Sequence, residues 1–185
     1  MPDSGGPGFF RGGNGINIGY RFQEPGEVSI HDDRWLTYPW GVNGGLPGMR
    51  SRKTLVRIDG TIEQLPSKVD HVRVEPGDVL HYITWGGGGW GDPLTRDPTL
   101  VAREVERGLV TKTGARRYGV VVAENGALDQ AATGRLREQM RAEREPPGIF
   151  SFGPSIDELR ARAQEETGLT APQVPVFRQR ATAVV

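Results

Sequence analysis

Apolar and polar residues alternate with a period of two along the first half of the chain. Between residues 16 and 22, four apolar side chains are separated by polar residues or glycine, which predicts a strand with one apolar face. Similar short patterns predict strands at 28–30, 55–58, 72–74 and 79–85. Turns at Asp59-Gly60 and Glu75-Pro76-Gly77-Asp78 end two of them. The pattern therefore predicts an antiparallel β-layer.

In the second half, apolar residues recur at helical spacing, and each segment opens on a capping residue. Asp97 precedes Pro98, and Gly108 follows the apolar segment, an arrangement typical of a helix. Three further caps predict helices: Thr111, Asp129, and Ser155, which forms a capping box with Glu158.

The helix predicted after Asp129 has two unlike faces. Ala132, Leu136 and Met140 recur every four residues and form an apolar side. We expect the opposite, charged side to be solvated. It carries Arg135, Arg137, Glu138, Arg141 and Arg144.

Glycine content divides the chain into two parts. Nineteen of its 27 glycines lie at or before Gly91, in the part predicted to form strands and loops. The predicted fold class is α+β, with a glycine-rich antiparallel β N-terminal half followed by a helical C-terminal half. We expect a β region over residues 1–95, a helical region over 96–170 and an extended tail over 171–185.

Charge and cysteine content exclude several classes of function. The 23 basic and 23 acidic residues cancel, and no long block of one sign indicates a nucleic-acid or membrane partner. The chain has no cysteine and therefore no disulfide or thiolate metal site. Because no apolar run suits a signal peptide or a bilayer span, we expect a cytoplasmic protein.

The segment at residues 3–15 combines glycines with polar side chains. Glycine lets a backbone approach a ligand closely, and the N–H groups of such a loop can hold an anion. The same composition also suits a tight structural connection in which Arg11 pairs with a carboxylate. The candidates for substrate binding are Asp3, Ser4, Gly5, Gly6, Arg11, Gly12, Gly13 and Asn14.

A second glycine segment, residues 86–91, fits the pattern GxGxxG after a predicted strand. Asp92-Pro93 follow where a dinucleotide-binding helix has to open, and no lysine followed by serine or threonine completes a phosphate loop. Both kinds of nucleotide site are therefore disfavoured. We expect a glycine hairpin held by packed Trp85 and Trp90, in preference to a loop lining an active-site mouth.

Histidines and carboxylates gather without the spacing of a metal site. Neighbouring residues on an extended chain point to opposite sides, so His31 and Asp32 are poorly placed to share an ion. We expect solvated turn charges and no metal bound by this chain. The residues considered are His31, Asp32, Asp33, Asp70, His71 and His81.

Candidate catalytic residues are not apparent. The chain has no GxSxG elbow, and no histidine lies near Ser4 in the sequence. Glu104, with Asp97 or Glu106, is interpreted as capping and surface charge. The catalytic residues therefore stay unknown.

Several segments form an ordered set of motifs along most of the chain. They are DSGGPGFFRGGNG at 3–15, YRF at 20–22, GGLPG at 44–48, EPGD at 75–78, GGGGWGDP at 86–93, RDP at 96–98, YGVVV at 118–122 and DELRARAQEETGL at 157–169. This set resembles the C-terminal region of the hydantoinase B/5-oxoprolinase family, which is related to subunits of acetone and acetophenone carboxylases.

The resemblance implies a heteromeric, ATP-dependent hydrolase that opens cyclic amides. Its chemistry is phosphorylation of an amide or carbonyl oxygen, followed by attack of water or a carbanion on the small-molecule substrate. In the family, ATP and Mg belong to an A-type ATPase subunit, and the divalent metal belongs to the N-terminal part of the B-type subunit. We therefore expect a split subunit that binds no cofactor alone, is inactive alone, and works with a hydantoinase A-type ATPase subunit and an N-terminal hydantoinase B-type chain.

Two alternatives stay open. In the first alternative, the chain is a subunit of an ATP-dependent ketone carboxylase of the acetone or acetophenone type. In the second, it is a non-catalytic assembly subunit. The motifs are shared among lactam, hydantoin and ketone enzymes and do not identify the substrate. Exposed Phe9 and Phe10, next to a strand edge, lead us to expect that about the first fifteen residues are buried against a companion chain.

Overall fold

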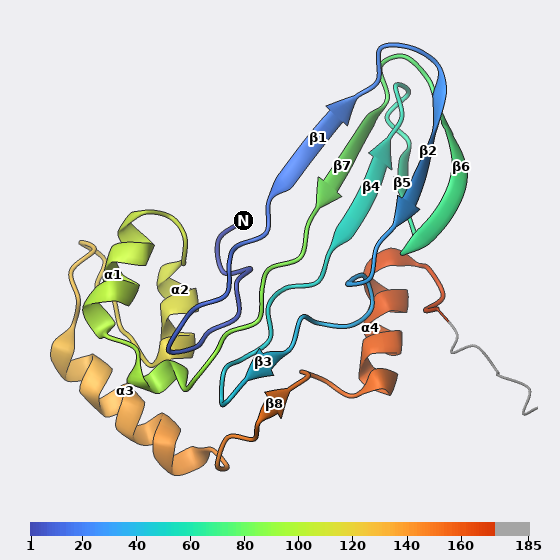
Figure 1. The fold of residues 1–185 in the computed structure, drawn as a ribbon. Coiled ribbons are helices and arrows are strands. Elements are labelled where there is room, and N and C mark those ends of the chain that lie inside the picture. Colours follow the sequence, from blue (N-terminus) through green and yellow to red (C-terminus); the bar gives the residue numbers. More distant parts are fainter. Residues whose placement is uncertain (173–185) are drawn as a thin grey trace, which may run out of the picture.

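The computed structural model describes residues 1–172 and has the α+β fold that the sequence predicts (Figure 1). Antiparallel strands occupy the first half, and helices dominate the second. The strands are β1 (Asn17–Arg21), β2 (Gly26–His31), β3 (Gly41–Val42), β4 (Arg52–Val56), β5 (Ile62–Gln64), β6 (Lys68–Val74), β7 (Val79–Ile83) and β8 (Phe150–Ser151). The helices are α1 (Pro98–Glu106), α2 (Lys112–Ala115), α3 (Gln130–Glu143) and α4 (Ile156–Thr167), with 3₁₀ turns η1 (Pro93–Thr95) and η2 (Arg116–Tyr118).

The principal sheet has four antiparallel strands in the order β1-β7-β4-β5. Leu55 of β4 lies opposite Leu80 of β7, and both side chains are buried. The two-stranded sheet of β2 and β6 contributes Ile30 and Val74 to the same core. Apolar positions from four of the predicted strands therefore meet in one cluster, whereas Ile58 stays exposed. Strand β1 forms an edge of the sheet, and its Tyr20 is half exposed.

The turn between β6 and β7 has the form that the sequence predicts. Gly77 has a φ of 95°, and Asp78 N donates to Glu75 O at 3.1 Å. The buried Asp78 carboxylate accepts hydrogen bonds from the N–H groups of Glu75 and Ile58 and from Arg57. These bonds, led by that from Glu75, hold the pKa of the Asp78 carboxyl below its usual range.

The helix ends fall where the capping residues predict them. Asp97 accepts from Thr99 N at 2.8 Å at the start of α1, and Gly108, just beyond its end, has a φ of 68°. Ser155 and Glu158 form the predicted capping box of α4. A separate core joins α1, α2 and the segment after them: Val101, Val110, Ala115, Tyr118, Val120 and Val122.

Helix α3 makes contacts through the side that was predicted to be solvated. Arg135, Glu138, Arg141 and Arg144 are exposed as expected, whereas Arg137 is partly buried. Three of the arginines, Arg137, Arg141 and Arg144, also make specific contacts. Their long side chains reach groups around η1 and η2, where carbonyl oxygens have no helical partner. Arg137 donates to the carbonyl oxygens of Arg96 and Tyr118, Arg141 donates to that of Leu94, and Arg144 pairs with the Asp92 carboxylate.

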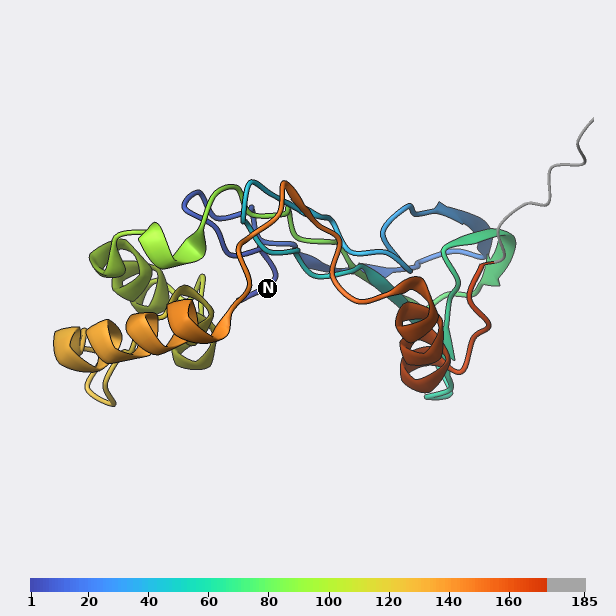
Figure 2. The ribbon, with the colours of Figure 1, turned by 90° about the horizontal axis from the view of Figure 1, so that it is seen from below.

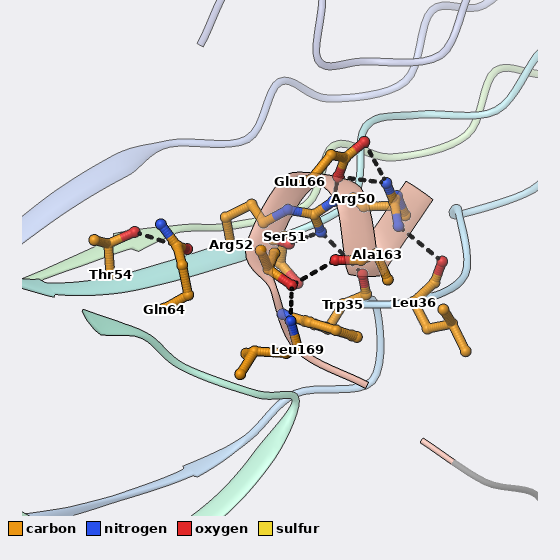
Figure 3. A network of polar contacts seen from close by, with 11 residues as sticks. Trp35, Leu36, Arg50, Ser51, Arg52, Thr54, Gln64, Ala163, Glu166 and Leu169 are labelled. Atoms are coloured by element: carbon orange, nitrogen blue, oxygen red, sulfur yellow. Dashed lines mark hydrogen bonds and ion pairs between the residues drawn. The ribbon is translucent and has the colours of Figure 1, made fainter. Parts of the chain in front are cut away.

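Helix α4 is fixed to the base of the principal sheet by ion pairs (Figure 3). Glu166 pairs with Arg52 and with the buried Arg50, whose Nη2 lies 2.8 Å from Oε2. Arg52 also donates to Trp35 O at 3.0 Å. Figure 2 shows that α3 and α4 lie on the same side of the extended middle of the molecule. Between these helices β8 pairs with β3, a contact that the sequence did not predict.

Two expectations concern the chain as a whole. The predicted tail at 171–185 falls almost entirely outside the described residues. Within residues 1–172, no helix combines the length and the apolar character that a membrane span requires.

Candidate functional site

Three glycine-rich segments lie between the principal sheet and the helices. We call residues 4–13, 41–48 and 86–91 the glycine bundle. Their main chains bond directly to one another: Gly6 N to Gly87 O at 2.8 Å, Gly89 N to Leu46 O at 2.9 Å, Val42 N to Gly89 O at 2.9 Å and Leu46 N to Pro7 O at 2.7 Å. Hydrogen bonds between extended chains therefore satisfy backbone groups that are buried here.

The segments approach so closely that certain positions admit only glycine. A Cβ atom on Gly86 would lie 1.8 Å from Ser4 O, and one on Gly12 would lie 2.0 Å from Gly87 O. Main-chain oxygens held by their own hydrogen bonds have little freedom to move aside. Gly13, by contrast, has no atom within 4 Å of an added Cβ. The glycines of the opening segment are thus not equivalent.

The tryptophans beside the third segment do not enclose it. Trp85 and Trp90 are 42% and 47% exposed. Trp90 and Phe10 instead exchange two main-chain hydrogen bonds, at 2.9 and 3.0 Å. The prediction of a hairpin held by packed tryptophans is wrong, because close contact between main chains holds these residues.

Asp3 joins the opening segment to the helical region. Its carboxylate accepts hydrogen bonds from Thr111 N and Oγ1 at 2.8 and 2.6 Å. Its backbone has a φ of 60°, in the left-handed region that non-glycine residues seldom adopt. Gly114 leaves room for the carboxylate, since a Cβ there would stand 1.8 Å from Asp3 Oδ1. Asp3 therefore binds the start of α2.

Ser4 closes the opening segment on itself. Its side chain is completely buried, and Oγ donates to Met1 O at 2.6 Å and accepts from Gly15 N at 2.9 Å. The hydroxyl therefore has a donor and an acceptor role within the segment.

Arg11 and Asn14 form a second link to the helices. Arg11 Nη1 donates to Asn14 Oδ1 at 2.8 Å, and its Nε donates to Glu104 Oε1 at 3.2 Å. The same Asn14 oxygen accepts from Gly5 N at 3.1 Å, while Asn14 Nδ2 donates to Leu109 O at 2.8 Å. Arg11 therefore pairs with a carboxylate, as the structural alternative expects.

The position of Glu104 differs from the one that the sequence predicts. It was interpreted as surface charge, but its side chain is only 14% exposed and lies between Arg11 and Arg96. Arg96 Nη2 donates to Glu104 Oε1 at 2.8 Å, and its Nη1 donates to Phe9 O at 2.5 Å. Burial, together with the nearby Glu104 charge, raises the pKa of Tyr118 to about 12. One carboxylate thus neutralises part of the charge of two guanidinium groups.

A model of the family described as Hydantoinase B/oxoprolinase matches residues 1–93. These residues contain the whole glycine bundle and the strands β1 to β7. The chain belongs to the hydantoinase B/oxoprolinase family. The resemblance stated from the motifs is therefore confirmed.

Relatives of this hydantoinase B-type chain include enzymes and enzyme subunits that are several times longer. It is 34% identical over 140 residues to the beta subunit of the caprolactamase of Pseudomonas jessenii, covering 72% of this chain and 24% of the relative. It is 33% identical to the B-type subunit of a putative D-/L-hydantoinase of Pseudomonas sp. strain NS671, covering 71% and 23%. It is 39% identical to 5-oxoprolinase 1 of Arabidopsis thaliana, covering 50% and 7%. The chain spans about a quarter or less of the length of these relatives.

Two solved structures contain the same fold. The ATP-dependent caprolactamase from Pseudomonas jessenii superposes with a TM-score of 0.60 at 33% identity, over 75% of this chain and 25% of that one. Nucleotide-free acetone carboxylase superposes with a TM-score of 0.61 at 22% identity, over 90% of this chain and 26% of that one. In both, the fold is one part of a longer chain.

The residues considered as metal ligands lie in separate contacts of the hydantoinase B-type fold. His31 Nε2 lies 3.2 Å from Asp70 Oδ1. Asp32 is buried in an ion pair with Lys53, so its interpretation as a solvated turn charge is wrong. Burial lowers the pKa of Lys53 to about 8.

The remaining candidate ligands also lie apart from one another. Asp33 pairs with Lys68, His71 contacts Glu27, and His81 lies on β7. Residues 1–172 bring together no group of three His, Cys, Asp or Glu side chains suited to a metal ion.

The candidate substrate-binding residues therefore meet in one place. The polar candidates use their side chains to bind other parts of the hydantoinase B-type chain: Asp3, Ser4, Arg11 and Asn14. Glycines among the candidates take part in the main-chain hydrogen bonds of the bundle. Direct contact between any of the eight and a substrate stays a prediction.

Proposed function

We propose that this chain forms part of the B-type subunit of an ATP-dependent amidohydrolase that opens cyclic amides such as hydantoins or 5-oxoproline. Membership of the hydantoinase B/oxoprolinase family carries the proposal. The names of its relatives support it, since they include a caprolactamase subunit, a hydantoinase subunit and a 5-oxoprolinase.

The contribution of this chain to that subunit is a rigid structural one. The main-chain bonds of the glycine bundle and the Arg11–Glu104–Arg96 cluster hold the opening motif in one conformation. Since no metal-ligand group is found among the described residues, we assign the divalent metal to a companion B-type polypeptide and ATP with Mg to an A-type ATPase subunit. We place the assembly in the cytoplasm, in keeping with a chain that has no cysteine.

Reconstitution tests the proposal. The chain is purified from its own organism through an affinity tag, together with the A-type and B-type polypeptides that accompany it. ATP hydrolysis is then measured with 5-oxoproline, hydantoin and caprolactam, and ring opening is followed by mass spectrometry. We expect coupled turnover of at least one cyclic amide by the complete set, and none by this chain alone. Turnover by the isolated chain, or undiminished turnover without it, contradicts the proposal.

A ketone carboxylase is the second candidate, favoured by the fold it shares with acetone carboxylase over 90% of the chain. The same preparation distinguishes the two, because only a carboxylase fixes labelled bicarbonate into acetone or acetophenone. Incorporation of label without ring opening replaces the first proposal.

A purely assembling role is tested with Arg11→Ala in the complete complex, using the exposed Arg107→Ala as the control. Loss of turnover from a complex that stays intact places Arg11 at the site. Dissociation of the complex shows that the motif acts in assembly alone.

A further inference from the structure

An apolar row crosses four neighbouring segments in the middle of the molecule. Val42 of β3 is paired with Phe150 of β8 on one side and with Trp90 on the other. Trp90 is in turn paired with Phe10. Directly paired residues of adjacent extended chains point to the same face. Phe150, Val42, Trp90 and Phe10 therefore share one face, although the first and last are 140 positions apart in the sequence.

A second pair of aromatic residues extends this row. Trp40 lies two residues before Val42, and Phe152 lies two residues after Phe150, just outside the ends of β3 and β8, so continued alternation brings both back to the same face. The ring centroids of Trp40 and Phe152 are 6.1 Å apart, and those of Phe150 and Phe152 are 5.9 Å apart. We call the six residues the aromatic face: Phe10, Trp40, Val42, Trp90, Phe150 and Phe152.

The aromatic face is open to solvent within the described part of the chain. Its five aromatic side chains are 42 to 62% exposed, whereas Trp35 and Tyr118 are at most 2% exposed. A contiguous exposed apolar patch of this kind marks an interaction surface, and aromatic residues are enriched at the centres of such interfaces. The glycine bundle fixes the main chains of Phe10, Val42 and Trp90, and main-chain bonds to residues 41–44 hold the segment that carries Phe150. Little order therefore remains to be gained when a partner binds.

We propose that the aromatic face binds the remaining part of a hydantoinase B-type polypeptide, an inference that rests on the proposed function. The relatives are about four times as long as the matched region, and in the solved caprolactamase this fold makes up 25% of the chain. The companion accordingly supplies an apolar surface of the kind found between permanently associated parts of one protein. Of the opening residues, 4–8 are already buried within this chain, whereas Phe10 is exposed as expected and belongs to the aromatic face.

Capture of the companion from the protein's own organism tests this surface. A tagged wild-type chain is compared with Phe10→Ala/Trp90→Ala and with Phe150→Ala/Phe152→Ala. The control is Ile58→Ala/Ile62→Ala, which removes two side chains of 76 and 65% exposure at the far end of β4 and β5. Thermal unfolding of each purified chain shows whether the variants stay folded. Bound polypeptides are identified and quantified by mass spectrometry.

We expect the wild type and the control to retain a polypeptide of the hydantoinase B/oxoprolinase family. We expect each aromatic double variant to retain at most about one tenth of the amount of that polypeptide, because truncating central aromatic residues typically removes this much affinity. If the folded aromatic variants retain as much of the polypeptide as the wild type, the aromatic face is not its binding surface, and the proposed function is unaffected. If the wild type retains no such polypeptide, the proposed function fails as well. If the aromatic variants lose only the A-type subunit, or only a dimer that the wild type forms, the face binds that partner instead, and the proposal is overturned.

Discussion

In the core of α1 and α2, buried side chains such as Val101 and Tyr118 fill the space between elements. In the glycine bundle, Gly12 and Gly86 contribute no side chain, and each main chain contacts the next directly. The apolar core tolerates a change of shape when neighbouring side chains adjust. The bundle has no such freedom, because its neighbours are hydrogen-bonded peptide groups. A glycine-rich sequence can therefore be as demanding as an apolar one.

The largest expected effect comes from Gly12→Ala. Its Cβ would lie 2.0 Å from Gly87 O, so the bundle must open, and we expect a loss of about 3 kcal/mol or more in the free energy of unfolding. Gly13→Ala is the matched control, since an added Cβ there meets nothing within 4 Å. It should change stability by less than about 0.5 kcal/mol. Urea denaturation measures both, and equal effects would remove the distinction between the two positions.

A core truncation gives the contrasting case. Leu55→Ala empties a fully buried position between the two sheets and should cost about 3 kcal/mol. Ile62→Ala, in the neighbouring strand, removes a side chain that is 65% exposed and should cost much less. The two chemical-denaturation midpoints check the prediction. A stable Leu55→Ala variant would show that the sheets are not held by this core.

The sequence predicted those parts of the fold whose signals are local. The caps at Asp97 and Ser155 depend on residues within one turn, and the strands follow from alternation. The Arg11–Glu104 pair joins residues 93 positions apart, so the sequence offered pairing with a carboxylate as one alternative for Arg11 but did not indicate which carboxylate. Because local patterns do not identify contacts between distant residues, the sequence also did not predict the pairing of β3 with β8. Nor did the sequence predict that Arg137 and Arg141 of α3 reach main-chain carbonyls, or that Arg144, just after the helix, reaches the Asp92 carboxylate.

The link between the bundle and the helices is tested by Glu104→Gln. Loss of its charge leaves Arg11 and Arg96 facing each other with low exposure, and we expect a cost of about 2 kcal/mol. Glu106→Gln, exposed on the same helix, is the control and should be nearly neutral. Thermal unfolding compares them. A neutral Glu104→Gln would mean that the cluster does not stabilise the junction.

A smaller effect is expected from the contact between α3 and Asp92. The Arg144 guanidinium lowers the pKa of the Asp92 carboxyl below its unfolded value of about 3.9. The resulting stabilisation is complete above that pH and is lost as the pH falls through the folded-state pKa. The difference in unfolding free energy between the wild type and Arg144→Gln should therefore shrink as the pH is lowered below about 4. Arg135→Gln, exposed on the same helix, should show no such dependence; a constant difference for Arg144→Gln would exclude this linkage.

Amide hydrogen exchange tests most directly whether main-chain bonds hold the glycine bundle. The amides of Gly6, Gly12, Gly87 and Gly89 all donate to main-chain oxygens of the bundle. We predict that in the isolated, folded chain they exchange as slowly as the amides of β4 and β7, which surround the apolar core. Exchange of these glycine amides at the rate of an unstructured peptide, while β4 and β7 remain protected, would contradict the account.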